Sequence, residues 1–185
     1  MTRKALGPIN PDWLADRKYK PSLSSNFPSD PEHGQLHFPA GHATDDPEWC
    51  YYDENYAKWL SMSRYTVIGK QFGSSSTLQG LHMDYASGTL WRYGGAVGVP
   101  NAYDWQLVSM RANVVVSSTC TFGVYRTGVA VTNGTIALAA STGASQDGYT
   151  TAATISAGGA IGIHQTAGTV VGGGVVSATF ARVMT

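Results

Sequence analysis

The chain has 185 residues, which is enough for one well-formed hydrophobic core or for one core with a smaller appendage. Its 12 basic and 12 acidic residues give a formal net charge of zero and form no basic run, so nucleic acid is not an expected partner. No apolar run approaches the ~20 residues of a transmembrane helix. The composition therefore predicts neither a nucleic-acid-binding protein nor a membrane protein.

The first residues and the cysteines are typical of a protein made in the cytoplasm. The opening sequence, MTRKALGPINPDW, contains no apolar stretch of the kind that a secretory signal requires. Cys50 and Cys120 stand alone, with no C-x-x-C pair and no disulfide framework around them. We expect two reduced, partly buried thiols.

Residues 1–27 are polar and are interrupted by Pro8, Pro11 and Pro21. Each proline fixes φ and disfavours helix in the residue before it, so this segment is predicted to be an extended arm. Apolar residues spaced along a polar tether cannot form a core by themselves, which favours attachment of the arm to a partner surface. The alternative is a poorly ordered terminus. The expected partner-binding residues are Trp13, Leu14, Tyr19, Leu23 and Phe27.

Residues 28–62 are rich in aromatic and acidic side chains and are predicted to form a small β-hairpin unit. We expect strands at 34–38, 48–52 and 56–60, with a turn at 53–55. The turn residues are polar, and the flanking runs carry the Tyr, Trp and Phe side chains that strands favour.

Residues 63–104 are predicted to provide connecting strands, at 65–72 and 89–93, which either begin the C-terminal domain or join it to the hairpin unit. Aromatic side chains of this region and of the hairpin unit are candidates for contact with a glycan or another subunit, because Tyr and Trp combine a large apolar area with a polar tip. Packing in the core is the alternative for the same residues. The candidates are Tyr52, Tyr56, Trp59 and Trp91.

Residues 105–185 are predicted to form an antiparallel β-sandwich or jelly-roll-like domain. Large and small residues alternate at 129–132 and 136–139, as in strands with one buried face. Asn133-Gly134, between these runs, predicts a type I′ hairpin turn, and a second turn is expected at 126–128. Further strands are expected at 150–156, 160–165 and 175–183, the last flanked by Gly168 and by the glycines at 172–174. No helix is expected, so the fold class is all-β.

The C-terminal domain is almost free of charge. After Asn113 the charged residues are Arg126, Asp147 and Arg182. A small domain normally needs charged side chains to stay soluble, so we expect this one to cover much of its surface with copies of itself. The alternative is a monomer whose surface consists of Thr, Ser and Asn.

Two stretches of the hairpin unit carry a pair of motifs. They read DPEHGQLHF at 30–38 and YDENYAKW at 52–59, with Gln35 where the motif usually has an acidic residue. The pair resembles a repeat found in tail-fibre and related virion proteins of tailed bacteriophages. The C-terminal segments GVYRTGVAVT, IHQTAGTV and VVSATFAR look like the terminal β-sandwich modules of phage fibres and of head or tail decoration proteins.

Candidate chemistry is sparse. His33, His37 and His42, followed by Asp45, Asp46 and Glu48, offer imidazole and carboxylate ligands, but their spacing matches no known metal motif, and a polar surface cluster is the preferred interpretation. No G-x-S-x-G, H-E-x-x-H or phosphate-loop pattern occurs. We expect no catalytic residues, no metal and no cofactor.

The resemblance implies a non-enzymatic virion structural protein, made in the host cytoplasm and acting in the virion. It implies a homotrimeric fibre or decoration protein, anchored by its arm to capsid, portal, collar or tail proteins and displaying a C-terminal β knob. The alternatives are a tail-fibre lectin that binds a host-surface glycan and, less favoured, a polysaccharide-degrading enzyme with paired carboxylates.

Overall fold

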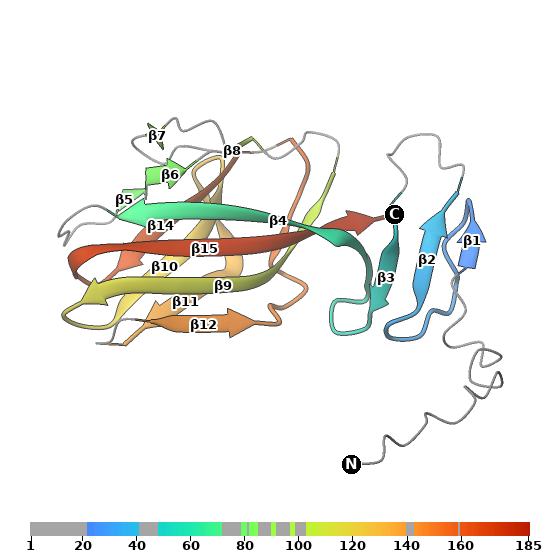
Figure 1. Ribbon diagram of the computed structural model, residues 1–185, viewed down its shortest axis with the longest axis horizontal. Coiled ribbons are helices and arrows are strands. Elements are labelled where there is room, and N and C mark those ends of the chain that lie inside the picture. Colours follow the sequence, from blue (N-terminus) through green and yellow to red (C-terminus); the bar gives the residue numbers. More distant parts are fainter. Residues whose placement is uncertain are drawn as a thin grey trace, which may run out of the picture.

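The computed structural model describes residues 22–40, 48–71, 79–80, 82–84, 90–91, 97–98, 103–139, 143–158 and 160–185. Throughout these residues the regular structure is strand and the fold is all-β, as predicted (Figure 1). No helix in this part of the chain is long and apolar enough to cross a membrane. Trp13, Leu14 and Tyr19 of the predicted arm lie outside the described residues.

The larger of two sheets, the front sheet, faces the viewer in Figure 1. Its order is β1 (Ser22–Ser24), β2 (Leu36–Pro39), β3 (Cys50–Asp53), β4 (Lys58–Gln71), β15 (Val170–Met184), β9 (Trp105–Val116) and β12 (Ala144–Asp147). Three short strands add to it: β13 (Thr154–Ile155) on β9, β6 (His82–Asp84) on β4, and β7 (Leu90–Trp91) on β6. Except for β1, which runs parallel to β2, the pairs are antiparallel.

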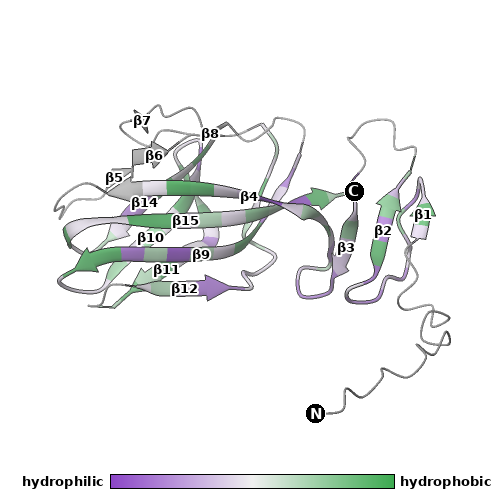
Figure 2. Ribbon diagram, viewed as in Figure 1, coloured by the Kyte–Doolittle hydropathy of each residue, from purple (hydrophilic) through white to green (hydrophobic). Residues whose placement is uncertain are grey.

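The smaller rear sheet packs behind the front one and closes a sandwich (Figure 1). Its order is β11 (Val129–Leu138), β10 (Cys120–Arg126), β14 (Ala160–Ala167) and β5 (Gln79–Gly80), with β8 (Val97–Gly98) also paired to β14. Side chains that alternate inward from both sheets form the core, and the hydropathy colours alternate accordingly along β9 (Figure 2). The largest buried core residues include Leu107, Met110, Phe122, Ile161 and Phe180.

Strand β4 joins the predicted hairpin unit to the sandwich. Its first residues, 58–61, pair with β3, residues 68–70 pair with β6, and β15 runs beside it from Trp59 to Gln71. The boundary predicted at residue 62 therefore falls inside a continuous strand, and residues 63–71 serve both as joint and as a central strand of the sandwich. We call β1–β3 with residues 58–62 the N-terminal unit.

Asn133-Gly134 does not form a hairpin turn, so that prediction is wrong. Strand β11 continues through both residues, and its pairing with β10 jumps from Tyr125↔Ala130 to Gly123↔Thr135. Four residues of β11 thus face one residue of β10, which is a β-bulge. Asn133 has a φ of 57°, in the left-handed region that Asn adopts more readily than most residues. This conformation is used in the bulge and not in a hairpin turn. The hairpin turn is Thr127-Gly128, where both φ values are positive, as a type I′ turn requires.

The glycines at 172–174 also differ from expectation. They lie within β15, which begins at Val170, rather than before the strand. The register between β15 and β9 shifts between Val170 and Gly174, so these glycines form a second bulge.

A stacked aromatic pair lies on the outer face of the rear sheet. The rings of Tyr125 and His164 are nearly parallel, at 10°, with centroids 4.1 Å apart. Each ring has a glycine as its neighbour on the other strand, since Gly123 pairs with His164 and Gly162 pairs with Tyr125. The missing side chains leave room for the rings to lean across the sheet, and half-burial of His164 lowers its pKa below the usual 6.5.

This pKa predicts a loss of stability in acid. The folded state binds the His164 proton more weakly than the unfolded state, so the contribution of neutral His164 is complete above about pH 6.5 and is lost as the pH falls through the lower, folded-state pKa. Chemical unfolding of the wild type and of His164→Phe, which keeps a ring but cannot titrate, measures this. We expect the variant to gain stability relative to the wild type as the pH falls from 7.5 to 5. A difference independent of pH would contradict the assignment.

Candidate functional site

Four large apolar side chains form one row across the N-terminal unit. Leu23 pairs with Phe38, and the pairing of His37 with Cys50 sets Phe38 opposite Trp49, whose ring lies 5.3 Å from that of Phe38. Met62 follows, since its N–H donates to the Trp49 carbonyl over 2.9 Å. Cross-strand neighbours point to the same face of a sheet, so the four side chains form a continuous strip. We call Leu23, Phe38, Trp49 and Met62 the apolar row.

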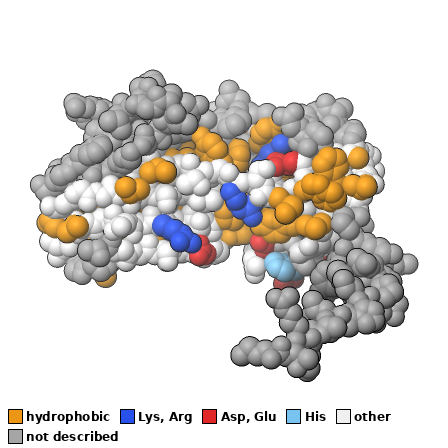
Figure 3. All heavy atoms as spheres, viewed as in Figure 1, with side chains coloured by type: hydrophobic (Ala, Val, Ile, Leu, Met, Phe, Trp, Pro, Cys, Tyr) orange, Lys and Arg blue, Asp and Glu red, His pale blue; other side chains and the backbone are white. Residues whose placement is uncertain are grey.

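The apolar row faces solvent. The exposed fraction is 68% for Leu23, 56% for Met62 and 40% for Trp49, while Phe38 is half-buried. Isolated apolar residues on a surface are ordinary, but a contiguous strip marks a site of interaction. Figure 3 shows hydrophobic side chains gathered over this end of the molecule.

The row continues into the outer face of the sandwich. Along β4 the side chains of Met62, Arg64, Thr66 and Ile68 are exposed, whereas Val67 is buried in the core. Across β15 and β9 the same face carries short, mainly uncharged side chains: Val175, Ser177, Thr179, Ser109, Asn113 and Val115. Among the described side chains of these three strands, the exposed charged ones are Arg64 and Arg111. The face is thus poor in charge, in agreement with the composition of the domain.

The opposite face of the N-terminal unit is a small core. Phe27, predicted to bind a partner, is partly buried and packs against this core, with its ring centroid 4.9 Å from His37 and 5.6 Å from Trp59. Cys50 and Met184 complete the cluster, with Tyr52 against its side. Burial, aided by the charge of Glu48, raises the pKa of the Cys50 thiol to about 12. Cys50 and Cys120 are both buried and free, and Cys50 donates to the His37 carbonyl over 3.2 Å.

The aromatic candidates of the hairpin unit are mostly interior. Trp59 is 7% and Tyr56 is 4% exposed, so neither offers a face to a glycan or a subunit, and packing in the core is the interpretation that holds for them. Tyr56 covers Leu60 and Ala181 at the edge of the apolar row. Tyr52 is half-buried, and for Trp91 only the backbone, in β7, is described.

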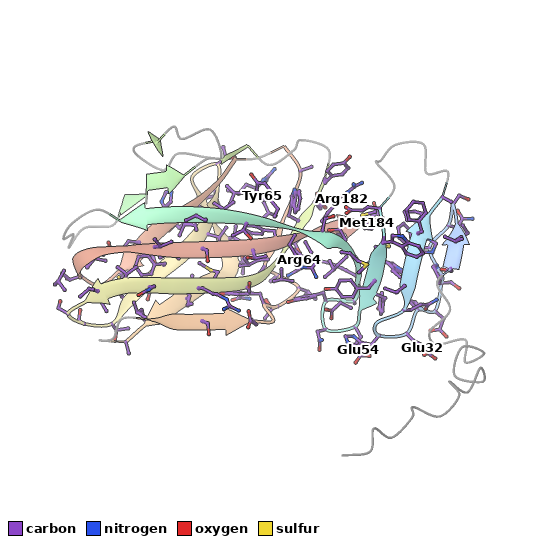
Figure 4. All side chains as sticks on the ribbon, viewed as in Figure 1. Glu32, Glu54, Arg64, Tyr65, Arg182 and Met184 are labelled. Atoms are coloured by element: carbon purple, nitrogen blue, oxygen red, sulfur yellow. The ribbon has the colours of Figure 1, made fainter. Side chains whose placement is uncertain are left out.

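Polar contacts fix the N-terminal unit against the sandwich. Arg182 of β15 is buried, lies 3.4 Å from the centroid of the Tyr103 ring and forms an ion pair with Glu48 at 3.7 Å (Figure 4). Its backbone N–H donates to Ser61 Oγ over 2.9 Å. The apolar row is therefore held on a rigid support.

A second polar cluster centres on Lys58. Its ammonium donates to Gln106 Oε1 over 3.0 Å and to the Thr154 hydroxyl, linking the start of β4 to β9 and β13. Burial lowers the pKa of Lys58, and the nearby charge of Asp104 acts in the opposite direction.

The predicted histidine and carboxylate cluster is only partly described. His42, Asp45 and Asp46 lie outside the described residues. His37 is buried, with Nδ1 2.6 Å from Ser22 Oγ, and His33 lies 3.9 Å from Asp53. Within the described part of the chain no three His, Cys, Asp or Glu side chains are grouped to hold a metal ion.

A scan against protein-family models finds no match for the chain, and neither does a search of curated proteins. One of the solved structures that are similar to this chain has 17% sequence identity and a TM-score of 0.36, and the match covers 68% of this chain and 91% of that chain. The structure is described as "Bacillus endospore appendages form a novel family of disulfide-linked pili". A likeness this remote bears on neither the activity nor the partners of the present chain.

Proposed function

We propose that the protein is a non-enzymatic structural subunit of a tailed-bacteriophage virion, a homotrimeric fibre or decoration protein attached to other virion proteins. The virion assignment rests on the resemblance of residues 30–38 and 52–59 to phage fibre motifs. The self-association rests on the apolar row and on the charge-poor face that continues it.

The apolar row is the observation that carries the proposal. Covering a side chain such as Leu23 or Met62 contributes about 1.5–3 kcal/mol. Only the surplus over the cost of association appears as affinity, so the row needs the wider face of β4, β15 and β9 to form a stable interface. That face carries mainly short uncharged side chains, so a copy that packs against it would desolvate few described charges, those of Arg64 and Arg111.

Self-association is tested by native mass spectrometry and light scattering on the full chain. We expect three times the mass of one chain at micromolar concentration. Met62→Glu places a carboxylate in the middle of the strip and should weaken association at least tenfold, because a desolvated, unpaired charge costs more than the ~1.4 kcal/mol of a tenfold change. Met62 is exposed, so we expect the melting temperature of the isolated subunit to change little.

Ser118→Glu is the matched control. Ser118 is exposed in the turn between β9 and β10, at the end of the sandwich far from the N-terminal unit, and the same charge there should leave the mass unchanged (Figure 1). A wild-type monomer, or a Met62→Glu oligomer of undiminished stability, would remove the apolar row from the proposal.

A further inference from the structure

Arg126 is a cation without an acidic partner among the described residues, in a domain that is nearly free of charge. It ends β10 and is half-buried. Its Nη2 donates to the Ala157 carbonyl over 2.7 Å, and its buried Nε has no hydrogen-bond partner. Among the described residues no carboxylate lies within ion-pair distance of it, whereas Arg182 pairs with Glu48. A partly buried guanidinium that lacks a counter-ion is a site for an anion.

A depression of about 410 Å³ opens beside this guanidinium, a volume within the range of small-molecule sites. The β10–β11 turn and the start of β11 form one wall, and the segment 152–156 forms the other. The lining residues are Arg126, Thr127, Val129, Ala130, Val131, Thr132, Ala152, Thr154 and Ser156. Hydroxyl groups and small apolar side chains thus surround a single cation.

The lining combines three kinds of contact. The guanidinium, whose Nη2 already donates to the Ala157 carbonyl, offers its positive charge and its remaining terminal N–H groups to a carboxylate. Thr132 and Ser156 are exposed and offer hydroxyls that can donate and accept. Val129 is 71% exposed and offers an apolar surface next to them. A ring that bears hydroxyls, C–H groups and one carboxylate satisfies all three.

Nearby charges leave the depression positive. Asp104 accepts the Ala157 N–H over 2.8 Å, and Arg126 donates to the carbonyl of the same residue, so the Ala157 backbone bridges the two groups, which form no direct ion pair. The Lys58 ammonium donates to the Thr154 hydroxyl. Among the described side chains, the Asp104 carboxylate and the Lys58 ammonium offset each other, and the Arg126 charge remains.

We propose that this depression binds an acidic saccharide unit, a hexuronic acid, with the carboxylate on Arg126 and the ring hydroxyls on Thr132 and Ser156. The site lies between β11 and segment 152–156, apart from the apolar row, so the inference does not depend on the proposed self-association. It gives the knob a ligand class of its own, the charged sugar of a surface polysaccharide.

A second depression along β11 offers an internal comparison. It has a similar volume, about 370 Å³, and is lined by Asn133, Thr135, Ala137, Gln146, Gly148, Tyr149 and Thr150. None of these residues is charged, and the Tyr149 hydroxyl already donates to the Thr135 carbonyl over 3.2 Å. We expect no uronic acid at this place.

Titration of the full-length protein with D-glucuronate, followed by calorimetry and by backbone amide NMR, tests the site. We expect shifts confined to the β10–β11 turn and residues 152–157. Neutral D-glucose should bind at least about tenfold more weakly, since it lacks the carboxylate that forms a charge-assisted hydrogen bond with the guanidinium. Acetate should also bind at least tenfold more weakly, because it lacks the ring and its hydroxyls.

Two variants test whether the Arg126 guanidinium is responsible for glucuronate binding. Arg126→Gln should reduce glucuronate affinity at least tenfold, and Arg111→Gln, which removes an exposed arginine of the front sheet, should leave it unchanged. Circular dichroism confirms that each variant folds. The proposal would be overturned if glucose or acetate bound as tightly as glucuronate, if the NMR shifts fell elsewhere, or if the wild type bound no glucuronate. These measurements use the wild type, so they test the proposal even if Arg126→Gln does not fold.

Discussion

Gly168→Ala is expected to lower the free energy of unfolding by about 2–5 kcal/mol, enough to unfold much of a marginally stable domain. Gly168 turns the chain from β14 into β15 with a φ of +85°, which costs an L-residue about 1–2 kcal/mol. An added Cβ would also lie 2.2 Å from the Thr119 carbonyl oxygen and 2.5 Å from Cys120 Cα. Both contacts are with backbone, so two turns must move apart, and overpacking of this kind adds about 1–3 kcal/mol.

Gly148→Ala isolates the backbone part of that effect. Gly148 has a φ of +70°, but a Cβ there meets nothing within 4 Å. We expect a loss of about 1–2 kcal/mol, which is the conformational cost alone. Urea unfolding of both variants against the wild type measures the difference. Equal losses would show that the turn at 117–119 yields at no cost and that Gly168 is chosen for its φ alone.

The structural role of individual glycines could not be predicted from the sequence. The sequence shows which residues tolerate positive φ or close approach, but not whether the reason is a turn, a bulge or a packed contact. Asn133-Gly134 has the composition of a hairpin turn, yet it forms a bulge because Thr127-Gly128 makes the turn a few residues earlier. The sequence predicts that the glycines at 172–174 precede a strand, but they lie within it, beside β9. The preference of a residue for a turn conformation can be read from the local sequence. Whether that conformation forms a turn or a bulge depends on a partner strand that is distant in sequence.

The all-β class and most strands could be predicted because alternation and turn residues are local signals. The apolar row could not. Leu23 was singled out as an anchor of the arm, but Phe38, Trp49 and Met62 were not, since each looks like an ordinary strand residue. They align only through the register of four strands, and a shift of one residue in any of them would turn its side chain to the other face.

The same argument explains Arg126. The scarcity of charged residues after Asn113 predicts self-association and gives Arg126 no separate role. That it borders a depression depends on segment 152–156 folding back against β11, which no local pattern indicates. A single cation in an uncharged domain is nevertheless a signal that sequence reasoning could use.

Arg182→Ala is expected to cost about 2–4 kcal/mol, the second large effect. Truncation removes a side chain that is 6% exposed, its contact with the Tyr103 ring and its ion pair with Glu48. Losing one partner of a buried pair costs about 3–5 kcal/mol, but Glu48 is 25% exposed and can regain water, which reduces the estimate. Because Arg182 joins β15 to the segment before β3, we expect hydrogen exchange to speed up most at residues 48–53 and 58–61.

Arg182→Met separates packing from charge in that effect. Methionine keeps an unbranched apolar stem against Tyr103 and removes the guanidinium, so it should recover about half of the alanine loss if packing matters as much as charge. Arg111→Ala, at an exposed position of the same sheet, should change stability by less than about 0.5 kcal/mol. If Arg182→Met is as unstable as Arg182→Ala, the charge alone holds the N-terminal unit to the sandwich. If neither variant loses stability, the continuous strand β4 is sufficient to hold the N-terminal unit to the sandwich. The polar contacts at Arg182 would then add nothing to stability.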